Sequence, residues 1–337
     1  MIGYALLRPF IFLLDAERAH RLSLYGVRLL PSLSSGSDEL ILASRVAGLN
    51  FPNPVGLAAG YDKDAEVPAQ MLRLGFGAVE VGTLTPVPQS GNPQPRLFRL
   101  IEDRAVINRM GFNNDGVDAC VERVRRSRFY QEGGVIGLNI GKNASTTLED
   151  ANQDYVMCMK AVYPVASYIT ANISSPNTKN LRDLQGETLL RQLLSALHQA
   201  RIALSDQYGV RKPLFLKIAP DLQANDFKFI ADLLLEFEID AVIATNTTIS
   251  RVDVATLPHG SEAGGLSGSP VLSLSNQAIH HLFQSLQNRV PIIGVGGIQS
   301  GNDVRQKIDA GASLVQLYTG LIYKGPQLIR DCVRAFN

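Results

Sequence analysis

The sequence predicts a closed (β/α)8 barrel, a TIM barrel, with a small helical extension at its N-terminus. Three observations predict this fold class. The chain has 337 residues, of which 45% are hydrophobic, enough for one large domain with a buried core. From residue 54 onward, a short apolar run followed by a longer amphipathic segment occurs eight times. Each run is apolar almost throughout, which is typical of parallel strands buried on both faces.

The eight predicted strands follow one another in the order that a barrel requires. They are residues 54–60, 78–83, 135–140, 168–174, 214–220, 241–247, 291–297 and 313–320. Amphipathic segments such as residues 225–238 and 302–309 separate them, so the repeating unit is a strand followed by a helix. An open doubly wound sheet is the alternative arrangement. Its usual glycine-rich nucleotide motif is incomplete, because a G-x-G-x-x-G that begins at Gly294 meets Gln299.

Residues 1–40 form the predicted extension, and residues 41–337 form the barrel. The apolar run at residues 2–14 is interrupted by a charged residue and a proline, so it is too short to span a bilayer. Acidic residues follow it directly, which makes a signal peptide a weak alternative. Asp15 is placed to cap a second amphipathic helix, and residues 31–38 have the composition of a linker. The sequence leaves open whether the two helices lie on a membrane or only pack on the barrel.

Charge and cysteine content exclude several kinds of protein. Lys and Arg number 32 against 31 Asp and Glu, a net charge of +1, so we expect no nucleic-acid partner. The three cysteines lie far apart and include no C-x-x-C pair. We therefore expect no disulfide framework and no zinc or iron–sulfur site, and the pattern indicates a reducing compartment.

Polar residues close the predicted strands, where the chemistry of such a barrel takes place. Glycines end the last two strands, and their backbone N–H groups favour a phosphate. Lys217 lies inside an apolar strand and needs an anion, which is either a ligand or a structural carboxylate. The amides expected nearby suit a planar heterocycle with C=O and N–H groups, and they are Asn108, Asn113, Asn139, Asn172, Asn177 and Asn246. The residues alone thus predict a phosphate-bearing cofactor and a polar planar substrate.

The stretches that carry these residues resemble a known family along the whole barrel. They include GLAAGYDKD, INRMGFNN, GLNIGKN, ANISSPNT, LKIAPDL, IATNTT, IIGVGGI and LVQLYTG, and together they resemble dihydroorotate dehydrogenase. The N-terminal DAERAH, and a serine at the end of N-I-S-S, are similar to the class 2, quinone-linked, membrane-associated branch. Ala65 replaces the commoner glycine of D-K-x-G-E, so we expect a slightly different turn after the first strand.

The resemblance implies an activity, a cofactor and a set of site residues. The activity is oxidation of (S)-dihydroorotate to orotate in pyrimidine biosynthesis, with hydride transfer to FMN and electrons then passed to a quinone. The residues implied for FMN are Ala59, Gly60, Lys63, Thr83, Asn139, Asn172, Lys217, Thr245, Gly268, Gly297, Tyr318 and Thr319. Those implied for the substrate are Lys63, Asn108, Arg109, Met110, Gly111, Phe112, Asn172, Asn177, Asn246 and Thr247. His20, Arg99 and Tyr318 are implied near the quinone head.

Ser175 is the catalytic residue that the resemblance implies. It would take the C5 proton of dihydroorotate, with Thr178, Phe112 and a bound water to relay that proton. Lys217 would stabilise negative charge on the reduced flavin, and Lys63 would meet the substrate carboxylate. Two alternatives stay open: a phosphate-binding aldolase or lyase that uses a strand-end lysine, and a non-catalytic flavin or quinone carrier.

The N-terminal helices are expected to form an apolar tunnel that leads a quinone from the bilayer to the flavin. Their apolar side chains would enter the headgroup boundary, and their arginines would meet anionic lipid. We expect a peripheral protein on the cytoplasmic face of the inner cell membrane, and the resemblance favours a monomer.

Overall fold

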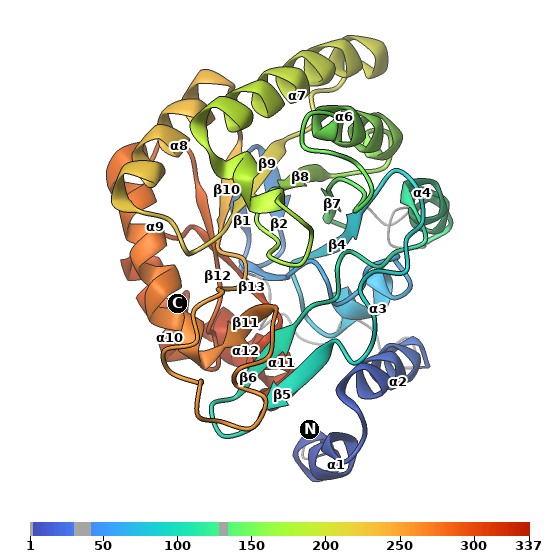
Figure 1. The fold of residues 1–337 in the computed structure, drawn as a ribbon, viewed down its shortest axis with the longest axis vertical. Helices are drawn as coiled ribbons and strands as arrows, with labels where there is room; N and C mark the ends of the chain where they lie inside the picture. Colours follow the sequence, from blue (N-terminus) through green and yellow to red (C-terminus); the bar gives the residue numbers. More distant parts are fainter. Residues whose placement is uncertain (1–2, 30–41, 128–133) are drawn as a thin grey trace.

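The computed structural model describes residues 3–29, 42–127 and 134–337 of the chain. Its centre is a closed barrel of eight parallel strands, with helices around it (Figure 1). Around the barrel the strands are β10 (Ala241–Ala244), β12 (Ile292–Val295), β13 (Leu314–Leu317), β3 (Val55–Leu57), β4 (Ala78–Leu84), β7 (Ile136–Ile140), β8 (Tyr168–Asn172) and β9 (Leu214–Ile218). Seven of the eight predicted apolar runs contain one of these strands, and β4 extends one residue beyond the predicted run 78–83. The barrel prediction is therefore confirmed, and the doubly wound alternative is wrong.

Helices follow the strands, as the repeating pattern predicts. They are α3 (Pro68–Arg73), α4 (Val117–Arg126), α6 (Ala151–Val162), α7 (Glu187–Tyr208), α8 (Ala224–Glu236), α9 (Leu272–Leu286), α10 (Gly301–Asp309), α11 (Thr319–Lys324) and α12 (Gln327–Arg334). The helices predicted at residues 225–238 and 302–309 appear as α8 and α10, with ends that differ by no more than two residues.

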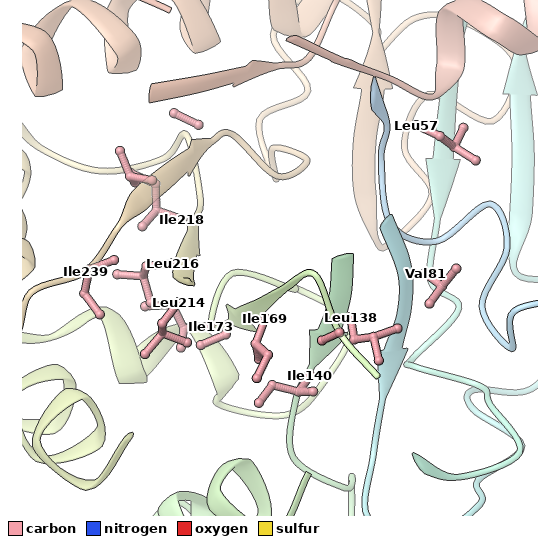
Figure 2. Close-up of a cluster of buried hydrophobic side chains, with 14 of the residues drawn as sticks. Leu57, Val81, Leu138, Ile140, Ile169, Ile173, Leu214, Leu216, Ile218 and Ile239 are labelled. Carbon is pink, nitrogen blue, oxygen red and sulfur yellow. The ribbon is translucent and has the colours of Figure 1, made fainter. Parts of the chain in front are cut away.

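Successive side chains of each strand point alternately outward to the helices and inward to the barrel interior, so the core has two parts. On β9, Leu214, Leu216 and Ile218 belong to the large apolar cluster between the barrel and its helices, part of which Figure 2 shows. Phe215, between them in sequence, belongs to a smaller cluster inside the barrel and stacks on Tyr168 with ring centroids 4.4 Å apart. Both faces of each strand are therefore buried, which explains why the strands are apolar almost throughout.

Two small sheets are present that the sequence did not reveal. The hairpin of β1 (Ser44–Val46) and β2 (Leu49–Phe51) packs on the interior cluster where the barrel strands begin. The strands β5 (Leu97–Leu100), β6 (Ala105–Asn108) and β11 (Gly265–Gly268) form an antiparallel sheet. These five segments read SRV, LNF, LFRL, AVIN and GLSG, and each contains a serine, an arginine or an asparagine, so none belongs to a longer apolar run of the kind that marked the barrel strands. The second sheet brings residues of two distant loops together beside the site.

The predicted N-terminal helices are confirmed as α1 (Gly3–Phe12) and α2 (Ala16–Arg28), which lie to one side of the barrel (Figure 1). Asp15 caps α2, because its Oδ1 accepts hydrogen bonds from the backbone N–H groups of Glu17 and Arg18. Within the described ranges, no helix has the length and apolar character needed to cross a bilayer. The predicted linker at residues 31–38 and the boundary at residue 40 lie outside the described residues.

A buried ion pair attaches α2 to the barrel. Arg96 Nη2 lies 2.8 Å from Glu17 Oε1, and the two side chains are only 6% and 7% exposed. The same guanidinium also donates to the carbonyl oxygens of Ser90 and Asn92. α2 is therefore anchored to the loop that precedes β5.

We predict that Glu17→Ala loosens α2 while the barrel stays folded. Removing one partner of a buried ion pair costs about 3–5 kcal/mol, which corresponds to about 100-fold or faster amide hydrogen exchange in α2. Glu122→Ala is the control, since Glu122 and Arg126 form an exposed pair on α4 and its loss costs about 0.5 kcal/mol or less. Unchanged exchange in α2 of Glu17→Ala would contradict the anchoring role.

Candidate active site

The carboxyl ends of the barrel strands surround one cavity. The predicted site residues that line it are Ala59, Gly60, Lys63, Thr83, Asn108, Met110, Gly111, Phe112, Asn172, Ser175, Asn177, Lys217, Thr245, Asn246, Thr247, Gly268, Gly297, Tyr318 and Thr319. They come from segments spread over most of the sequence. The parallel barrel brings them together because every strand ends at the same rim. Their individual roles stay predictions.

One side of the cavity is built from glycine backbone and hydroxyl groups. Gly268 and Gly297 have φ values of 100° and 82°. A Cβ at Gly268 would lie 2.3 Å from a carbonyl oxygen, and one at Gly297 would lie 2.4 Å from Leu272 Cα, so glycine is needed at both positions. Nearby, Thr319 Oγ1 donates to Ser267 Oγ at 2.8 Å. Open backbone and hydroxyl groups of this kind suit a phosphate.

Several polar groups reach the cavity without a partner in the described part of the chain. Lys217 is 5% exposed, and burial lowers its pKa while the negative charge of Glu80 opposes that shift. Its Nζ makes no hydrogen bond to another described residue. Thr245 Oγ1 and Gln316 Oε1 are also buried and without a hydrogen-bond partner among the described residues. An ammonium, a hydroxyl and a carbonyl oxygen together fit a bound molecule with polar atoms along its edge.

Lys63 supplies a second positive charge to the cavity. Its Nζ donates to Asn113 Oδ1 at 2.8 Å, and no described carboxylate forms an ion pair with it. Burial, together with the positive charge of Arg96, lowers the pKa of Lys63 to about 8. Lys63 can therefore meet an anionic ligand at neutral pH and lose its charge in mildly alkaline solution.

The amide side chains that line the cavity, Asn108, Asn172, Asn177 and Asn246, form what we call the amide wall, and a continuous series of hydrogen bonds joins Asn172 to the barrel interior. Asn139 Nδ2 donates to Glu80 Oε1 at 2.8 Å, and Asn139 Oδ1 accepts from Thr83 Oγ1 at 2.6 Å. Thr83 Oγ1 accepts in turn from Asn172 Nδ2 at 2.9 Å. Asn139 is fully buried and does not line the cavity. It therefore acts on the cavity through Thr83, although the sequence predicts direct contact with the cofactor.

Ser175 lies at the rim in the loop that follows β8. Its Oγ accepts a hydrogen bond from the backbone N–H of Asn177 at 3.2 Å. Asn177 Nδ2 donates to Asn108 Oδ1 at 3.0 Å, which ties this loop to the end of β6. Thr178 Oγ1 is buried and has no hydrogen-bond partner among the described residues. The serine and the threonine of the expected relay thus each keep hydrogen-bonding capacity for a ligand or a water.

The Arg109 side chain, predicted for the substrate, does not line this cavity. Arg99, predicted near a quinone head beside the N-terminal helices, lies outside the cavity next to those helices, and its quinone role stays a prediction. Arg109 turns toward Glu262, with its Nη1 2.6 Å from Oε2, and its guanidinium lies 4.6 Å from the Phe98 ring centroid. Arg99, on β5, donates to the carbonyl oxygens of Ile11 and Leu14 at the end of α1. Arg109 and Arg99 thus connect neighbouring segments of the protein, and neither guanidinium faces a ligand bound in the cavity.

His20 is linked to the cavity by aromatic contacts. Its ring packs edge-on against Tyr61 with centroids 5.1 Å apart, and Tyr61 packs edge-on against Tyr318 at 6.4 Å. Tyr318 lines the cavity, and Ser23 Oγ lies 2.9 Å from the Tyr61 hydroxyl. Burial, together with the positive charge of Lys63, lowers the pKa of His20 to about 4. His20 is therefore neutral at pH 7 and reaches the cavity only through Tyr61.

Sequence reasoning missed the polar residues that lie deepest in the site. Glu80 and Gln316 face the barrel interior, and Ser267 lines the cavity. The signal that identified Lys217, a polar residue inside an apolar strand, was also present at Glu80 and Gln316. Ala65 is buried with a φ of 58°, so the turn after β3 adopts a conformation that favours glycine. In the described residues, no cluster of three or more His, Cys, Asp or Glu could hold a metal ion.

Comparison with known proteins gives a consistent result. A family model for dihydroorotate dehydrogenase matches residues 41–337. Proteins named dihydroorotate dehydrogenase (quinone) are similar over 99% of this chain: one from Polynucleobacter asymbioticus is 61% identical and is covered over 98% of its length. Another, from Herminiimonas arsenicoxydans, is 56% identical and is covered over 97% of its length.

A solved structure is similar to the whole fold. The crystal structure of DHODH from Eimeria tenella in complex with ferulenol has a TM-score of 0.89 and 39% sequence identity, and the match covers 96% of this chain and 90% of that one. The ligand-free form from the same organism has a TM-score of 0.87. These relatives do not favour the aldolase or the carrier alternative.

Proposed function

The chain belongs to the dihydroorotate dehydrogenase family, and from that premise we propose that it oxidises (S)-dihydroorotate to orotate in pyrimidine biosynthesis and delivers the electrons to a quinone. One observation in the structure supports this activity most strongly. Ser175, Lys63 and the amide wall line the same cavity as the unpartnered Lys217. A base, a carboxylate site and a positive charge for a reduced cofactor therefore converge where one substrate could reach all of them.

FMN is the cofactor that we propose for this cavity. Support comes from the unpartnered Thr245 Oγ1 and Gln316 Oε1, and from the glycine backbone at Gly268 and Gly297. When bound, FMN would accept the hydride and later yield electrons to the quinone. Lys217 would lie at the ring and counter negative charge there. The remaining residues of the proposed FMN site are Ala59, Gly60, Lys63, Thr83, Asn172, Tyr318 and Thr319, with Asn139 acting through Thr83.

The substrate would be held by charge and by amides. We expect the Lys63 ammonium to meet the carboxylate of dihydroorotate, since no described carboxylate forms an ion pair with it. The ring carries C=O and N–H groups, for which amide side chains offer matching donors and acceptors. Those amides would come from Asn108, Asn172, Asn177 and Asn246, with the segment Met110, Gly111 and Phe112 and the Thr247 side chain beside them.

Ser175 Oγ would take the proton from C5 of dihydroorotate as the hydride leaves C6. A serine hydroxyl is a weak base, so it has to pass on its own proton at the same time. The buried and unpartnered Thr178 Oγ1 is suited to receive that proton through a water. The Asn177 N–H that donates to Ser175 Oγ would stabilise negative charge on the serine during this transfer.

The N-terminal helices would bring the protein to the membrane and the quinone to the flavin. On α1, Leu6 and Phe10 are 66% and 71% exposed, and Leu13 just beyond its end is 83% exposed, an apolar surface that suits the headgroup boundary. His20, Tyr61 and Tyr318 lead from α2 toward the cavity, and they are the route we propose for the quinone head. Arg99 would keep the end of α1 in place. A peripheral monomer on the cytoplasmic face of the inner membrane is part of this proposal.

We predict that Ser175→Ala slows reduction of the bound flavin by dihydroorotate by about 100-fold or more, the usual scale for loss of a general base. FMN content and orotate binding should stay close to those of the wild type. Anaerobic stopped-flow absorbance measures the rate. Ser313→Ala, an exposed serine just before β13, is the control and should reduce flavin normally. Near-normal reduction in Ser175→Ala would remove this serine from the mechanism.

The pKa of Lys63 predicts how orotate binding depends on pH. The ammonium is present below about pH 8 and is lost as the pH rises, so the Kd for orotate should rise by up to about tenfold per pH unit above that value. Calorimetry on the holoenzyme measures this profile. In Lys63→Arg the charge persists, so any remaining affinity should stay flat across the same range. A wild-type Kd that did not change between about pH 7 and 9.5 would contradict the Lys63 contact.

The exposed apolar surface at α1 predicts weaker membrane binding in the double variant Phe10→Ser/Leu13→Ser. Two large side chains withdrawn from the interface should lower binding to vesicles of anionic phospholipid by about tenfold or more. Reduction of a long-chain quinone should fall, while reduction of a soluble dye should not. Val252→Ser is the control, because Val252 is 88% exposed on the barrel. Equal vesicle binding by all three proteins would refute the role of α1.

A further inference from the structure

We propose that Glu80 is a positioning residue for the substrate-facing side of the cavity: it orients Asn139 and, through Thr83, provides the acceptor that the Asn172 side chain needs in the orientation in which Asn172 and Asn246 face the ligand. The inference rests on the proposed function, because the ligand concerned is dihydroorotate or orotate. Glu80 lies in the middle of β4, is fully buried and does not line the cavity. It therefore acts on the ligand only through other residues.

The two oxygens of the Glu80 carboxylate receive different donors. Oε2 accepts from the Tyr168 hydroxyl at 3.1 Å, from Thr170 Oγ1 at 3.2 Å and from Gln316 Nε2 at 2.9 Å. Oε1 accepts from Asn139 Nδ2 at 2.8 Å. A carboxylate accepts at both oxygens, so Asn139 has to present its NH2 group to Glu80 and its carbonyl oxygen to the other side.

The orientation of Asn139 determines each following link. Its Oδ1 takes the hydroxyl proton of Thr83, so the Thr83 oxygen is left to accept from Asn172 Nδ2. Asn172 Oδ1 then faces three donors, which are the Ser174 N–H at 3.2 Å, the Ser174 hydroxyl at 2.9 Å and Asn246 Nδ2 at 3.4 Å. Every hydrogen bond in this series therefore has a defined donor and acceptor, from Glu80 in the barrel interior to Asn246 at the wall of the cavity.

At the cavity end of this series of hydrogen bonds, backbone N–H groups fix which side-chain atom of Asn172 and of Asn246 is the acceptor. The Ser174 N–H can only donate, and it holds Asn172 Oδ1 in place. The Thr247 N–H does the same for Asn246 Oδ1 at 2.8 Å. With an acceptor at Glu80 Oε1, every donor in this series, including the Thr83 hydroxyl, has an acceptor.

Glu80 also orients Gln316. Because Gln316 Nε2 donates to Glu80 Oε2, the carbonyl oxygen of Gln316 is turned away from the carboxylate. That oxygen is buried and has no partner among the described residues, and Gln316 lines the cavity. The same carboxylate thus leaves an acceptor available to a bound molecule.

Glu80→Gln would introduce a conflict into this series of hydrogen bonds without changing its shape. Three donors converge on the position of Oε2, so the amide oxygen of the introduced glutamine would occupy that place and its NH2 group would face Asn139. A donor would then meet the Asn139 NH2 group, or Asn139 would turn over and leave the Thr83 hydroxyl, which would accept from both amides, without its acceptor for its own proton. A lost or reversed hydrogen bond at the wall should weaken orotate binding by about tenfold or more.

The double variant Glu80→Gln/Asn139→Asp should restore these hydrogen bonds. The carboxylate at position 139 would accept from the NH2 group of the introduced glutamine with one oxygen and from Thr83 with the other. The total charge and nearly the same shape are kept. A residue needed only for packing or folding would not be rescued in this way, so the double variant separates the positioning role from a structural one.

The experiment measures FMN content, thermal unfolding and the Kd for orotate of the holoenzymes. Glu80→Gln should bind orotate about tenfold or more weakly, and Glu80→Gln/Asn139→Asp should return to within about threefold of the wild type. Thr170→Val, which removes one donor to the same carboxylate but leaves this series of hydrogen bonds intact, should bind within about twofold of the wild type. If Glu80→Gln loses FMN, recovery of FMN and orotate binding in the double variant supports the proposal.

Two results would overturn the proposal. One is a Glu80→Gln holoenzyme that binds orotate as the wild type does. The other is a double variant that binds orotate no better than Glu80→Gln. A wild-type holoenzyme that bound no orotate would overturn the proposed function and this inference with it, whereas normal wild-type binding that neither variant changes overturns this inference alone.

Discussion

A carboxylate that is fully buried inside a barrel has to be satisfied by the barrel itself, and Glu80 imposes this requirement on the strands around it. Its donors come from β7 and β8 on one side of β4 and from β13 on the other, so strands on both sides of β4 are tied to one point. The polar half of the interior begins there and continues through Asn139 and Thr83 to the cavity. Hydrogen bonds around Glu80, rather than apolar packing, therefore support the residues at the bottom of the cavity.

On the side of Glu80 where the strands begin, the barrel interior is apolar. Tyr168 lies at the boundary between this apolar half and the polar half that leads to the cavity. Its ring stacks on Phe215 in the apolar half, while its hydroxyl donates to Glu80. The ring passes over Gly137 so closely that a Cβ there would lie 2.2 Å from it, which explains a glycine in the middle of β7. Apolar packing thus closes the end where the strands begin, and polar chemistry is confined to the end where they finish.

The sequence predicted the barrel well because each strand is a separate apolar run, and a parallel barrel places all strand ends together. The sequence singled out Lys217 because a charged residue inside an apolar strand needs an anionic partner. It could not distinguish Asn139, which lies behind Thr83, from Asn172, which reaches the cavity, because both end a strand with an amide. Arg109 was assigned to the substrate, yet its partner Glu262 comes from a distant loop. Side-chain direction depends on such tertiary partners, which spacing along the chain does not encode.

We propose that electrons pass through this one cavity from dihydroorotate to a quinone. The most direct test is anaerobic addition of dihydroorotate to the purified holoenzyme, followed by a quinone, while the flavin absorbance is recorded. Dihydroorotate should bleach the flavin, the quinone should restore the absorbance, and orotate should accumulate in an amount equal to the electron acceptors reduced. A flavin spectrum that dihydroorotate leaves unchanged would show that this cavity does not oxidise dihydroorotate.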